Sequence, residues 1–265
     1  PEYWEGAPGV AEVHVIAIPD GEARVQALLT GQIDMNRYVP FSQKKIFDGN
    51  SKFSVSVIPT GNWRGMVMRT DTAPFDNPKV RKAVRMAVDR QELVDLVMGG
   101  AAIVACDTPV APSDQYRMDM DCPQNISKAK NLLREAGYPN GIEMVIHVST
   151  KEPTWPTIGE VLQQQLAKAN IKAEVKMTPS KSYWKETWMK KPVAMTRWNE
   201  RPADSALHEI YHSGAKWNES FFKNPAFDEN LAKARGELDF NKRKVAYQNA
   251  QKTLWEESGT MIPYH

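Results

Sequence analysis

The segment from His208 to His212 carries the residue types of a zinc site at the spacing of the HExxH motif. On a helix, His208 and His212 would lie one turn apart on the same face and bind the metal, and Glu209 would act as the general base of peptide hydrolysis. The segment therefore suggests one possible chemistry, that of a zinc metallopeptidase.

A catalytic zinc ion also needs a third protein ligand further along the chain. The extended form of the motif requires Gly and His three and six residues after His212, where this chain has Ala215 and Asn218. Glu219 or Glu229 could supply the ligand, although no further motif supports either one. We therefore keep the peptidase as a minor alternative and expect neither catalytic residues nor a metal site.

The chain contains two cysteines, Cys106 and Cys122. Neither has a second ligand at the short spacing that a metal site needs, and neither lies at a predicted helix start that would favour a reactive thiolate. The residues alone leave two interpretations equally open, a disulfide in an oxidising compartment or two unrelated buried thiols.

Trp184 and Trp188 lie among four lysines, an arrangement that can stack on the bases of a nucleic acid. The lysines are Lys181, Lys185, Lys190 and Lys191. However, 34 basic and 32 acidic residues give a net charge of only +2, whereas a nucleic-acid-binding domain normally has a large, clustered basic excess. We expect a solvated amphipathic helix here and no nucleic-acid partner.

The length and composition are those of a globular domain. The 265 residues suffice for one large or two small domains, and 42% are hydrophobic and 25% charged, as in ordinary soluble proteins. No apolar run approaches the roughly 18 residues that a membrane span needs. No signal peptide is visible, but the abrupt start at Pro1-Glu2-Tyr3-Trp4 is typical of a trimmed terminus, so location stays open.

Hydrophobic periodicity predicts a mixed order of strands and helices. We expect strands over residues 12–19, 33–35, 53–58, 63–68, 142–148, 171–177 and 193–198. We expect helices over residues 22–30, 78–88, 89–98, 126–136, 157–169, 183–189, 225–237 and 241–257. Prolines and polar residues predict an irregular surface segment over 101–122. The strand–helix–strand order within 142–177 predicts a βαβ unit with parallel strands.

Two of the predicted helices begin with capping signals. Asn77 followed by Pro78 is typical of an N-cap and the first helical position. Asp89 and Glu92 have the spacing of a capping box. These signals fix the two predicted helix starts.

Five segments, in this order, resemble motifs of the bacterial family of dipeptide-, oligopeptide- and nickel-binding proteins. They are Tyr3-Trp4-Glu5-Gly6 with Pro8, ARVQALLTGQID at 23–34, PFDNPKVRKAVRMAVDR at 74–90, AKNLLREAGY at 129–138, and NPAFD at 224–228 with Arg235. Each segment alone is a generic helix start or helix face. Together they run over nearly the whole chain, and this order makes the resemblance specific.

The resemblance implies an α/β fold of the periplasmic-binding-protein type, type II-like, with a mixed sheet and flanking helices. Two lobes would close on a ligand by a hinge motion. Residues 1–68 would form part of lobe I, and residues 69–265 would form lobe II. The resemblance also implies binding without chemistry on the ligand and without a cofactor.

The same resemblance implies a role in import. The protein would be the substrate-binding component of an ABC importer, a monomer that carries a peptide-like or anionic small solute to permease subunits in the membrane. Its expected place is the periplasm or another extracytoplasmic compartment. That oxidising setting favours the disulfide interpretation for Cys106 and Cys122.

One segment departs from the family pattern. In peptide-binding members, a Trp at the end of a lobe II strand is followed three residues later by an Asp that pairs with the amino group of the peptide. The matching segment runs from Trp198 through Asn199 to Asp204, and its third residue is Arg201. A guanidinium repels an amine and favours a carboxylate or another planar anion. We expect Arg201 to bind such a group and Trp198 to pack on the apolar part of the ligand.

Two alternatives bear on these ligand contacts. Arg201 could instead form a structural ion pair with Glu200 or Asp204. Trp63 and Arg69 flank the strand that leads into the second lobe, near the expected hinge, and are further candidates for contact with the ligand. Many family members have Asn where this chain has Arg69.

Overall fold

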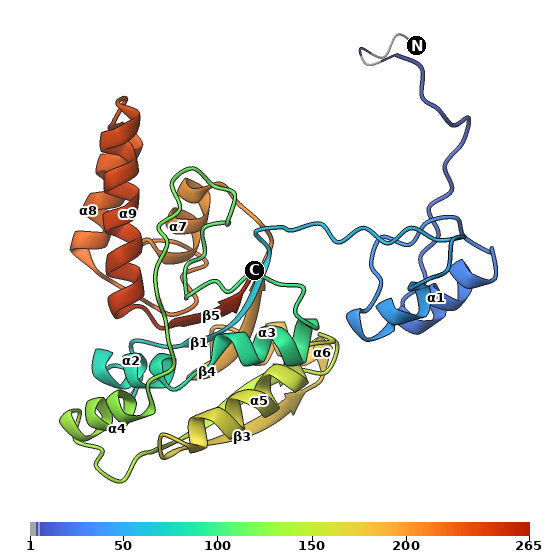
Figure 1. Cartoon of the computed structure of the whole chain (residues 1–265). Coiled ribbons are helices and arrows are strands. Elements are labelled where there is room, and N and C mark those ends of the chain that lie inside the picture. Colours follow the sequence, from blue (N-terminus) through green and yellow to red (C-terminus); the bar gives the residue numbers. More distant parts are fainter. Residues whose placement is uncertain (1–3, 5) are drawn as a thin grey trace. The chain divides into compact units, whose positions relative to one another are not determined.

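The computed structural model describes Trp4 and residues 6–265, so Tyr3 and Glu5 of the first resembling segment lie outside the described residues (Figure 1). The chain divides into two compact units, Pro1–Ser56 and Val57–His265. This division falls before the predicted strand at 63–68, which belongs to the second unit. The assignment of residues 1–68 and 69–265 to two lobes stays a prediction.

The first unit contains two short helices. Helix α1 (Gly21–Leu29) begins at Asp20, whose side chain accepts a hydrogen bond from Ala23 N, and the 3-10 helix η1 spans Phe41–Phe47. The strands predicted over 12–19, 33–35 and 53–58 are wrong, because no strand forms in these ranges. Val15 is 94% exposed. An alternating segment becomes a strand only where a neighbouring strand takes up its backbone groups, and the described residues of this unit offer none.

The second unit is built on a five-stranded sheet in the order β3-β2-β4-β1-β5. The strands are β1 (Trp63–Met68), β2 (Ile142–Ser149), β3 (Ile171–Thr178), β4 (Val193–Trp198) and β5 (Thr260–Tyr264). Strand β2 is parallel to both β3 and β4, whereas β1 is antiparallel to β4 and β5. The predicted βαβ unit is confirmed, and the sheet is mixed as expected.

The helices of the second unit follow the predicted pattern except for α7, which was not predicted. They are α2 (Pro78–Met86), α3 (Arg90–Met98), α4 (Ile126–Glu135), α5 (Trp155–Ala167), α6 (Ser180–Ser182), the π-helix η2 (Tyr183–Thr187), α7 (Ala203–Tyr211), α8 (Pro225–Gly236) and α9 (Phe240–Glu257). Both predicted N-caps are confirmed. Asn77 accepts a hydrogen bond from Lys79 N, and Asp89 accepts one from Glu92 N.

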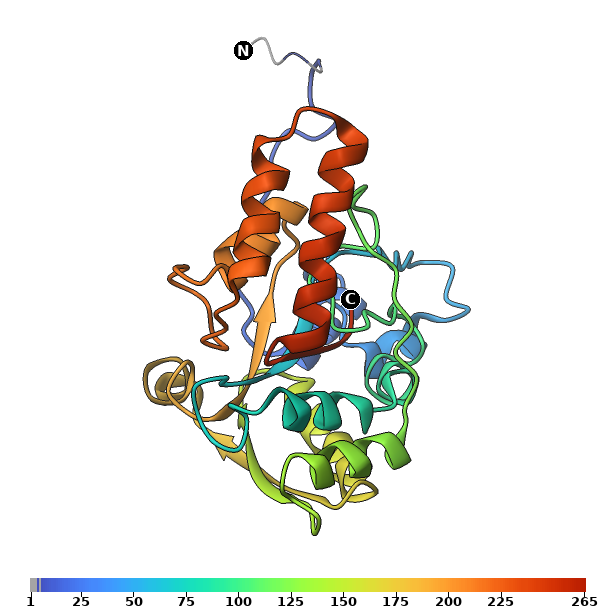
Figure 2. The ribbon, with the colours of Figure 1, turned by 90° about the vertical axis from the view of Figure 1, so that its left-hand side faces the viewer.

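Two hydrophobic clusters cover the two faces of the sheet. Helices α2 to α5 contribute to a cluster that includes Met66 and Met68 of β1. Helices α7 to α9 form the other cluster with Trp63 and Ile262. Figure 2 shows α8 and α9 as an antiparallel pair. Alternate residues of β1 therefore hold both layers together, as strand geometry requires.

Three arginines connect the helices with the ends of distant segments. Arg81 and Arg85 of α2 donate hydrogen bonds to the carbonyl groups of Trp255, Glu256 and Glu257 at the end of α9. A cation there satisfies carbonyl groups that lack helical partners and complements the helix dipole. Two arginines of the segment at 74–90 thus have a structural role.

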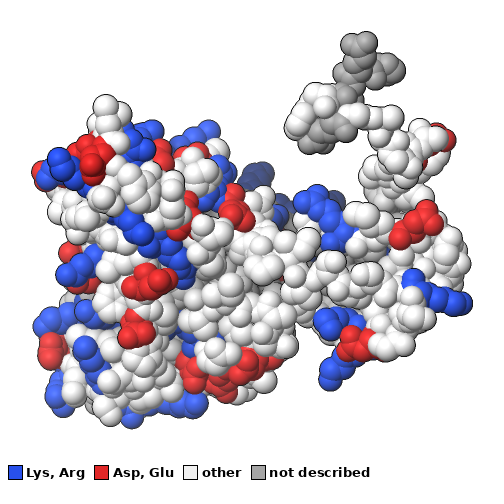
Figure 3. Space-filling model, turned by 45° about the horizontal axis from the view of Figure 1, so that its top comes forward, with Lys and Arg blue, Asp and Glu red and all other residues white. Residues whose placement is uncertain are grey.

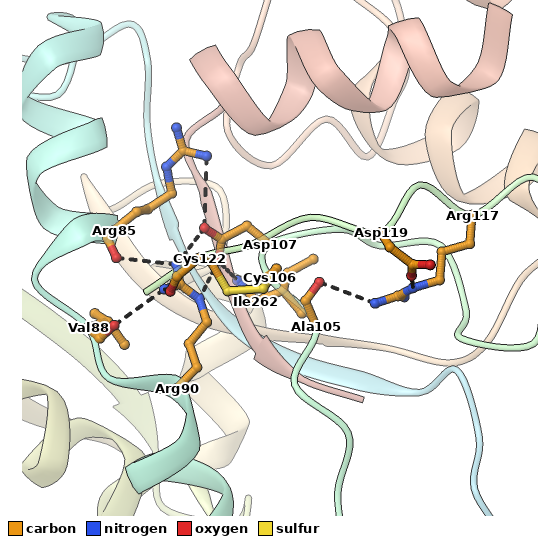
Figure 4. Close-up of a disulfide and its surroundings, with 10 residues drawn as sticks. All are labelled: Arg85, Val88, Arg90, Ala105, Cys106, Asp107, Arg117, Asp119, Cys122 and Ile262. Atoms are coloured by element: carbon orange, nitrogen blue, oxygen red, sulfur yellow. Dashed lines mark hydrogen bonds and ion pairs between the residues drawn. A yellow bond between two sulfur atoms is a disulfide. The ribbon is translucent and has the colours of Figure 1, made fainter. Parts of the chain in front are cut away.

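The third arginine, Arg90 at the start of α3, lies in a buried ion cluster beside the disulfide (Figure 4). Its guanidinium donates to Asp107 Oδ2 at 2.6 Å and to the carbonyl groups of Cys122 and Arg85. Asp107 also accepts a hydrogen bond from Ile262 N of β5. One carboxylate therefore connects α3, β5 and the irregular segment at 101–122.

The structure joins Cys106 and Cys122 in a disulfide with a sequence separation of 16. We expect Cys106→Ser with Cys122→Ser to lower the free energy of unfolding by about 3 kcal/mol, because the open loop gains entropy in the unfolded chain. Urea unfolding of the oxidised double variant and the wild type measures this. The wild type with reductant is the control and should match the variant. Equal midpoints for oxidised wild type and variant would contradict the expectation.

Candidate functional site

The end of strand β4 presents an aromatic ring with charged groups at its face and its edge. Trp198 is the last residue of β4 and is paired with Trp63 of β1. The guanidinium of Arg201 lies over the Trp198 ring, 5.2 Å from its centroid. Arg201 reaches this position because the chain turns at Asn199–Pro202 before α7 begins at Ala203.

Arg201 forms an ion pair, but not with either predicted partner. Its Nη1 lies 2.9 Å from Glu209 Oε2 on α7. Glu200 instead accepts a hydrogen bond from Gly61 N, and Asp204 contacts Arg235 and Tyr247. The Nε of Arg201 is buried and has no hydrogen-bond partner among the described residues.

Beneath this aromatic surface lies Glu219, a carboxylate that is only 4% exposed. One of its oxygens, Oε1, accepts three hydrogen bonds. The donors are Trp188 Nε1 at 2.7 Å, Thr196 Oγ1 at 2.8 Å and Trp198 Nε1 at 3.2 Å. The carboxylate thereby fixes two indole rings that come from different segments.

The other oxygen of this carboxylate, Oε2, is buried without a hydrogen-bond partner among the described residues. Burial raises the pKa of Glu219 to about 7, although the three donors act in the opposite direction. A buried polar atom without a hydrogen-bond partner lowers the stability of the folded protein, and such atoms are rare in folded proteins.

Glu219 lines a small cavity of about 10 Å³ between β1, β4 and the segment after η2. This space is about that of one water molecule. Its lining residues are Val67, Arg69, Trp188, Met189, Lys191, Ala194, Met195, Thr196 and Glu219. The lining of the cavity therefore contains both apolar and charged side chains.

Arg69, a predicted ligand contact, lines the same cavity. Its guanidinium pairs with Asp71 through two hydrogen bonds of 2.9 and 2.7 Å, donates to the carbonyl of Met189 and lies 3.9 Å from the centre of the Phe221 ring. The structure therefore brings Arg69 and Trp198 to the surroundings of one residue, Glu219.

The other predicted contacts differ in their exposure. Trp63 is the cross-strand neighbour of Trp198, but it is 1% exposed and belongs to the core beside α7 to α9. Asp204 is partly exposed and held by Arg235 and Tyr247. Asn199 is exposed in the turn after β4. Of the predicted set, Trp198 and Arg201 lie together at the end of β4, whereas Arg69 lines the cavity near the start of that strand.

The HExxH segment does not assemble as a zinc site. His208 lies on α7, whereas His212 has left the helical conformation. Glu209, the base of the motif, is paired with Arg201. The two proposed third ligands are also engaged, Glu219 with the indoles and Glu229 with Lys233. The described residues contain no group of three metal-binding side chains.

Sequence reasoning did not identify Glu219 as part of a ligand site. Its three hydrogen bonds connect it with residues 21 to 31 positions earlier, and no local motif marks such pairings. The available signal was weaker: an acidic residue follows the tryptophans at 188 and 198 in the sequence, and a buried indole needs an acceptor for its N–H group.

The distribution of charged side chains and the character of the helices agree with the near-neutral net charge and the globular composition of the chain. On the face of the second unit that Figure 3 shows, basic and acidic side chains are interspersed rather than gathered in one stripe. Among the residues that the structure describes, no helix has the length and apolar character that a membrane crossing demands.

Comparison with known proteins places these features in a family. Residues 1–218 match the family model described as "Bacterial extracellular solute-binding proteins, family 5 Middle". The glutathione-binding protein GsiB of Pectobacterium atrosepticum is 29% identical over 272 residues, and that of Escherichia coli K12 is 31% identical over 271. Each alignment covers 97% of this chain and 52% of the relative, so the chain spans about half the length of these relatives.

Solved structures share the fold. The periplasmic binding protein DppA of Helicobacter pylori, in complex with the peptide STSA, superposes with a TM-score of 0.83 at 24% identity over 93% of this chain and 50% of that one. NikZ of Campylobacter jejuni, in complex with Ni(L-His), gives 0.82 at 20% identity over 93% and 53%. These likenesses confirm the predicted periplasmic-binding-protein fold, and the family match supports neither the zinc motif nor a peptidase. The chain belongs to family 5 of the bacterial extracellular solute-binding proteins.

Proposed function

We propose that the full protein containing this chain is the substrate-binding component of an ABC importer. It binds a peptide-like or anionic small solute at the surface formed by Trp198, Arg201 and the Glu219 cavity, and it presents the solute to permease subunits. Family membership supports the role in binding. The observation that carries the proposed location is the indole of Trp198, which has a guanidinium over its face and a buried carboxylate at its edge.

The same proposal covers the setting of the protein. It acts as a monomer outside the cytoplasm, binds no nucleic acid, uses no cofactor and does no chemistry on its solute. The family is described as extracellular. One relative is named for binding glutathione, and a protein of the same fold was solved in complex with a peptide. A disulfide in the structure fits an oxidising compartment.

Arg201 supplies the charge that this site needs for an anionic group. A guanidinium over an indole keeps its planar donors in place for a carboxylate. We expect Arg201→Ala in the full-length protein to weaken binding of an anionic solute tenfold or more, measured by isothermal titration calorimetry.

Two variants separate this effect from general damage. Arg235→Ala removes another arginine of the same region, one that pairs with Asp204, and should leave affinity within twofold. Glu209→Gln removes the charge that competes for Arg201 and should not weaken binding. Unchanged affinity in Arg201→Ala, or equal losses in Arg201→Ala and Arg235→Ala, would contradict the assignment of Arg201.

The experiment that tests the proposed function is a thermal-shift screen of the full-length protein. A solute that binds the folded protein stabilises it by RT ln(1 + [L]/Kd), so the unfolding midpoint rises with the logarithm of the solute concentration once this exceeds Kd. The screen includes glutathione, short peptides and small organic anions. A concentration-dependent shift with one class supports the proposal, whereas turnover of the bound solute would show that the protein is an enzyme.

A further inference from the structure

Arg201 offers an incoming anion only one end of its guanidinium group. Its Nε is buried and has no hydrogen-bond partner among the described residues, although the side chain as a whole is 34% exposed. The ring of Trp198 covers one face of the guanidinium. A carboxylate binds an arginine best through two parallel N–H···O bonds. Because Nε is out of reach, a bidentate pair with a solute has to use Nη1 and Nη2.

Glu209 already occupies half of that end. Its Oε2 lies 2.9 Å from Nη1 of Arg201. Glu209 is part of helix α7, and its side chain is 33% exposed. Glu200 and Asp204, the carboxylates nearer to Arg201 in the sequence, are held by other groups. A solute carboxylate that takes both Nη1 and Nη2 therefore displaces Glu209.

We propose that Glu209 is an internal competitor for Arg201 and thereby a specificity-determining residue of the solute site. This inference rests on the proposed function, because it requires that Arg201 binds the anionic group of the solute. Displacement breaks the ion pair between Arg201 and Glu209, and the displaced carboxylate repels the anion that replaces it. When the solute leaves, Glu209 pairs with Arg201 again. The site thus binds an anion less tightly, and releases it more readily, than it would without Glu209.

The exposure of the ion pair limits the size of this effect. Each of the two side chains is about one-third exposed, and ion pairs in such positions are weak because solvent screens them. Removal of the Glu209 charge should therefore tighten the binding of an anion about twofold to fivefold. A neutral solute of the same shape should gain nothing, because it does not compete for the charge of Arg201.

The test uses phenylacetate and phenylacetamide, which share one ring and differ in charge. The ring can pack on Trp198 while the carboxylate reaches Arg201, so tryptophan fluorescence follows binding to the full-length protein at pH 8 and constant ionic strength. A probe of ten heavy atoms should half-saturate the wild type at about 5 mM. We expect Glu209→Gln to lower this concentration about twofold to fivefold for phenylacetate and to leave it unchanged for phenylacetamide.

Two further variants separate the direct contact from a general loss of negative charge. Glu200→Gln removes a neighbouring carboxylate that is bound to Gly61 N rather than to Arg201, and it should leave the phenylacetate response nearly unchanged. Arg201→Ala should weaken phenylacetate binding, and the addition of Glu209→Gln to that variant should not restore it.

The inference is overturned if Glu209→Gln binds phenylacetate no more tightly than the wild type, or if it gains equally for both probes. An equal gain in Glu200→Gln, restored binding in the double variant, or no phenylacetate response in either the wild type or Glu209→Gln would also overturn it. A solute from the thermal-shift screen that binds more weakly to Arg201→Ala but equally to Glu209→Gln would refute the competitor alone. A protein that binds no solute in that screen would refute the proposed function.

Discussion

Replacing Asp107 by Ala is expected to lower the free energy of unfolding by about 3–5 kcal/mol, the usual cost of removing one partner from a buried ion pair. The substitution leaves Arg90, whose side chain is 3% exposed, without its 2.6 Å partner. It also removes the acceptor for Ile262 N and one of the charges near Arg85. Urea unfolding followed by circular dichroism measures the loss.

The matched control is Asp119→Ala in the same irregular segment. Asp119 also pairs with an arginine, Arg117, but its side chain is 97% exposed, and such surface pairs contribute at most about 1 kcal/mol. We therefore expect a small loss for the control and a large one for Asp107. Similar losses of unfolding free energy in the two variants would show that burial does not determine how much the Asp107 ion pair stabilises the protein.

The second large effect concerns the pH dependence of stability at Glu219. Its pKa is about 7 in the folded protein because of burial, whereas an unfolded Glu titrates near 4.5. Between these values the folded state holds a proton that the unfolded state has released, so stability falls as pH rises. The full loss is about 3 kcal/mol and is present above pH 7.

Comparison of the wild type with Glu219→Gln isolates this contribution, since other titrating groups act equally on both. The free energy of unfolding of Glu219→Gln, relative to the wild type, should increase by about 3 kcal/mol from pH 4.5 to pH 8. Parallel pH profiles would contradict the raised pKa. If the stability of Glu219→Gln relative to the wild type rises with pH, the ionised Glu219 carboxylate reduces the stability of the wild type. Groups that serve binding often reduce stability in this way.

The sequence predicted the second unit well where its signals are local. Asn77 and Asp89 mark helix starts because an N-cap depends on residues within one turn, and the alternation at 142–148 and 171–177 marks strands because both pair within one βαβ unit. The strand β5 was missed. Its Pro263 argues against a strand, and only pairing with β1 and the bridge of Tyr264 to Val104 define it.

Other errors have the same origin in distant partners. Val13 and Val15 alternate with polar residues, yet no neighbouring strand is present among the described residues of the first unit, so the segment stays irregular. At the site, the prediction for Trp198 and Arg201 came from one short segment. Glu209, the actual partner of Arg201, lies on the next helix, α7. Glu219 lies 21 residues after Trp198 and meets it only in the folded protein.

The protein is expected to bind a solute through Trp198, Arg201 and Glu219 and to release it unchanged. Isothermal titration calorimetry of the full-length protein with the solute class found in the thermal-shift screen, in wild type and in Arg201→Ala, tests this most directly. We predict one saturable site in the wild type, at least tenfold weaker binding in the variant, and recovery of the intact solute. Equal affinity in both proteins, or a chemically altered solute, would contradict the account.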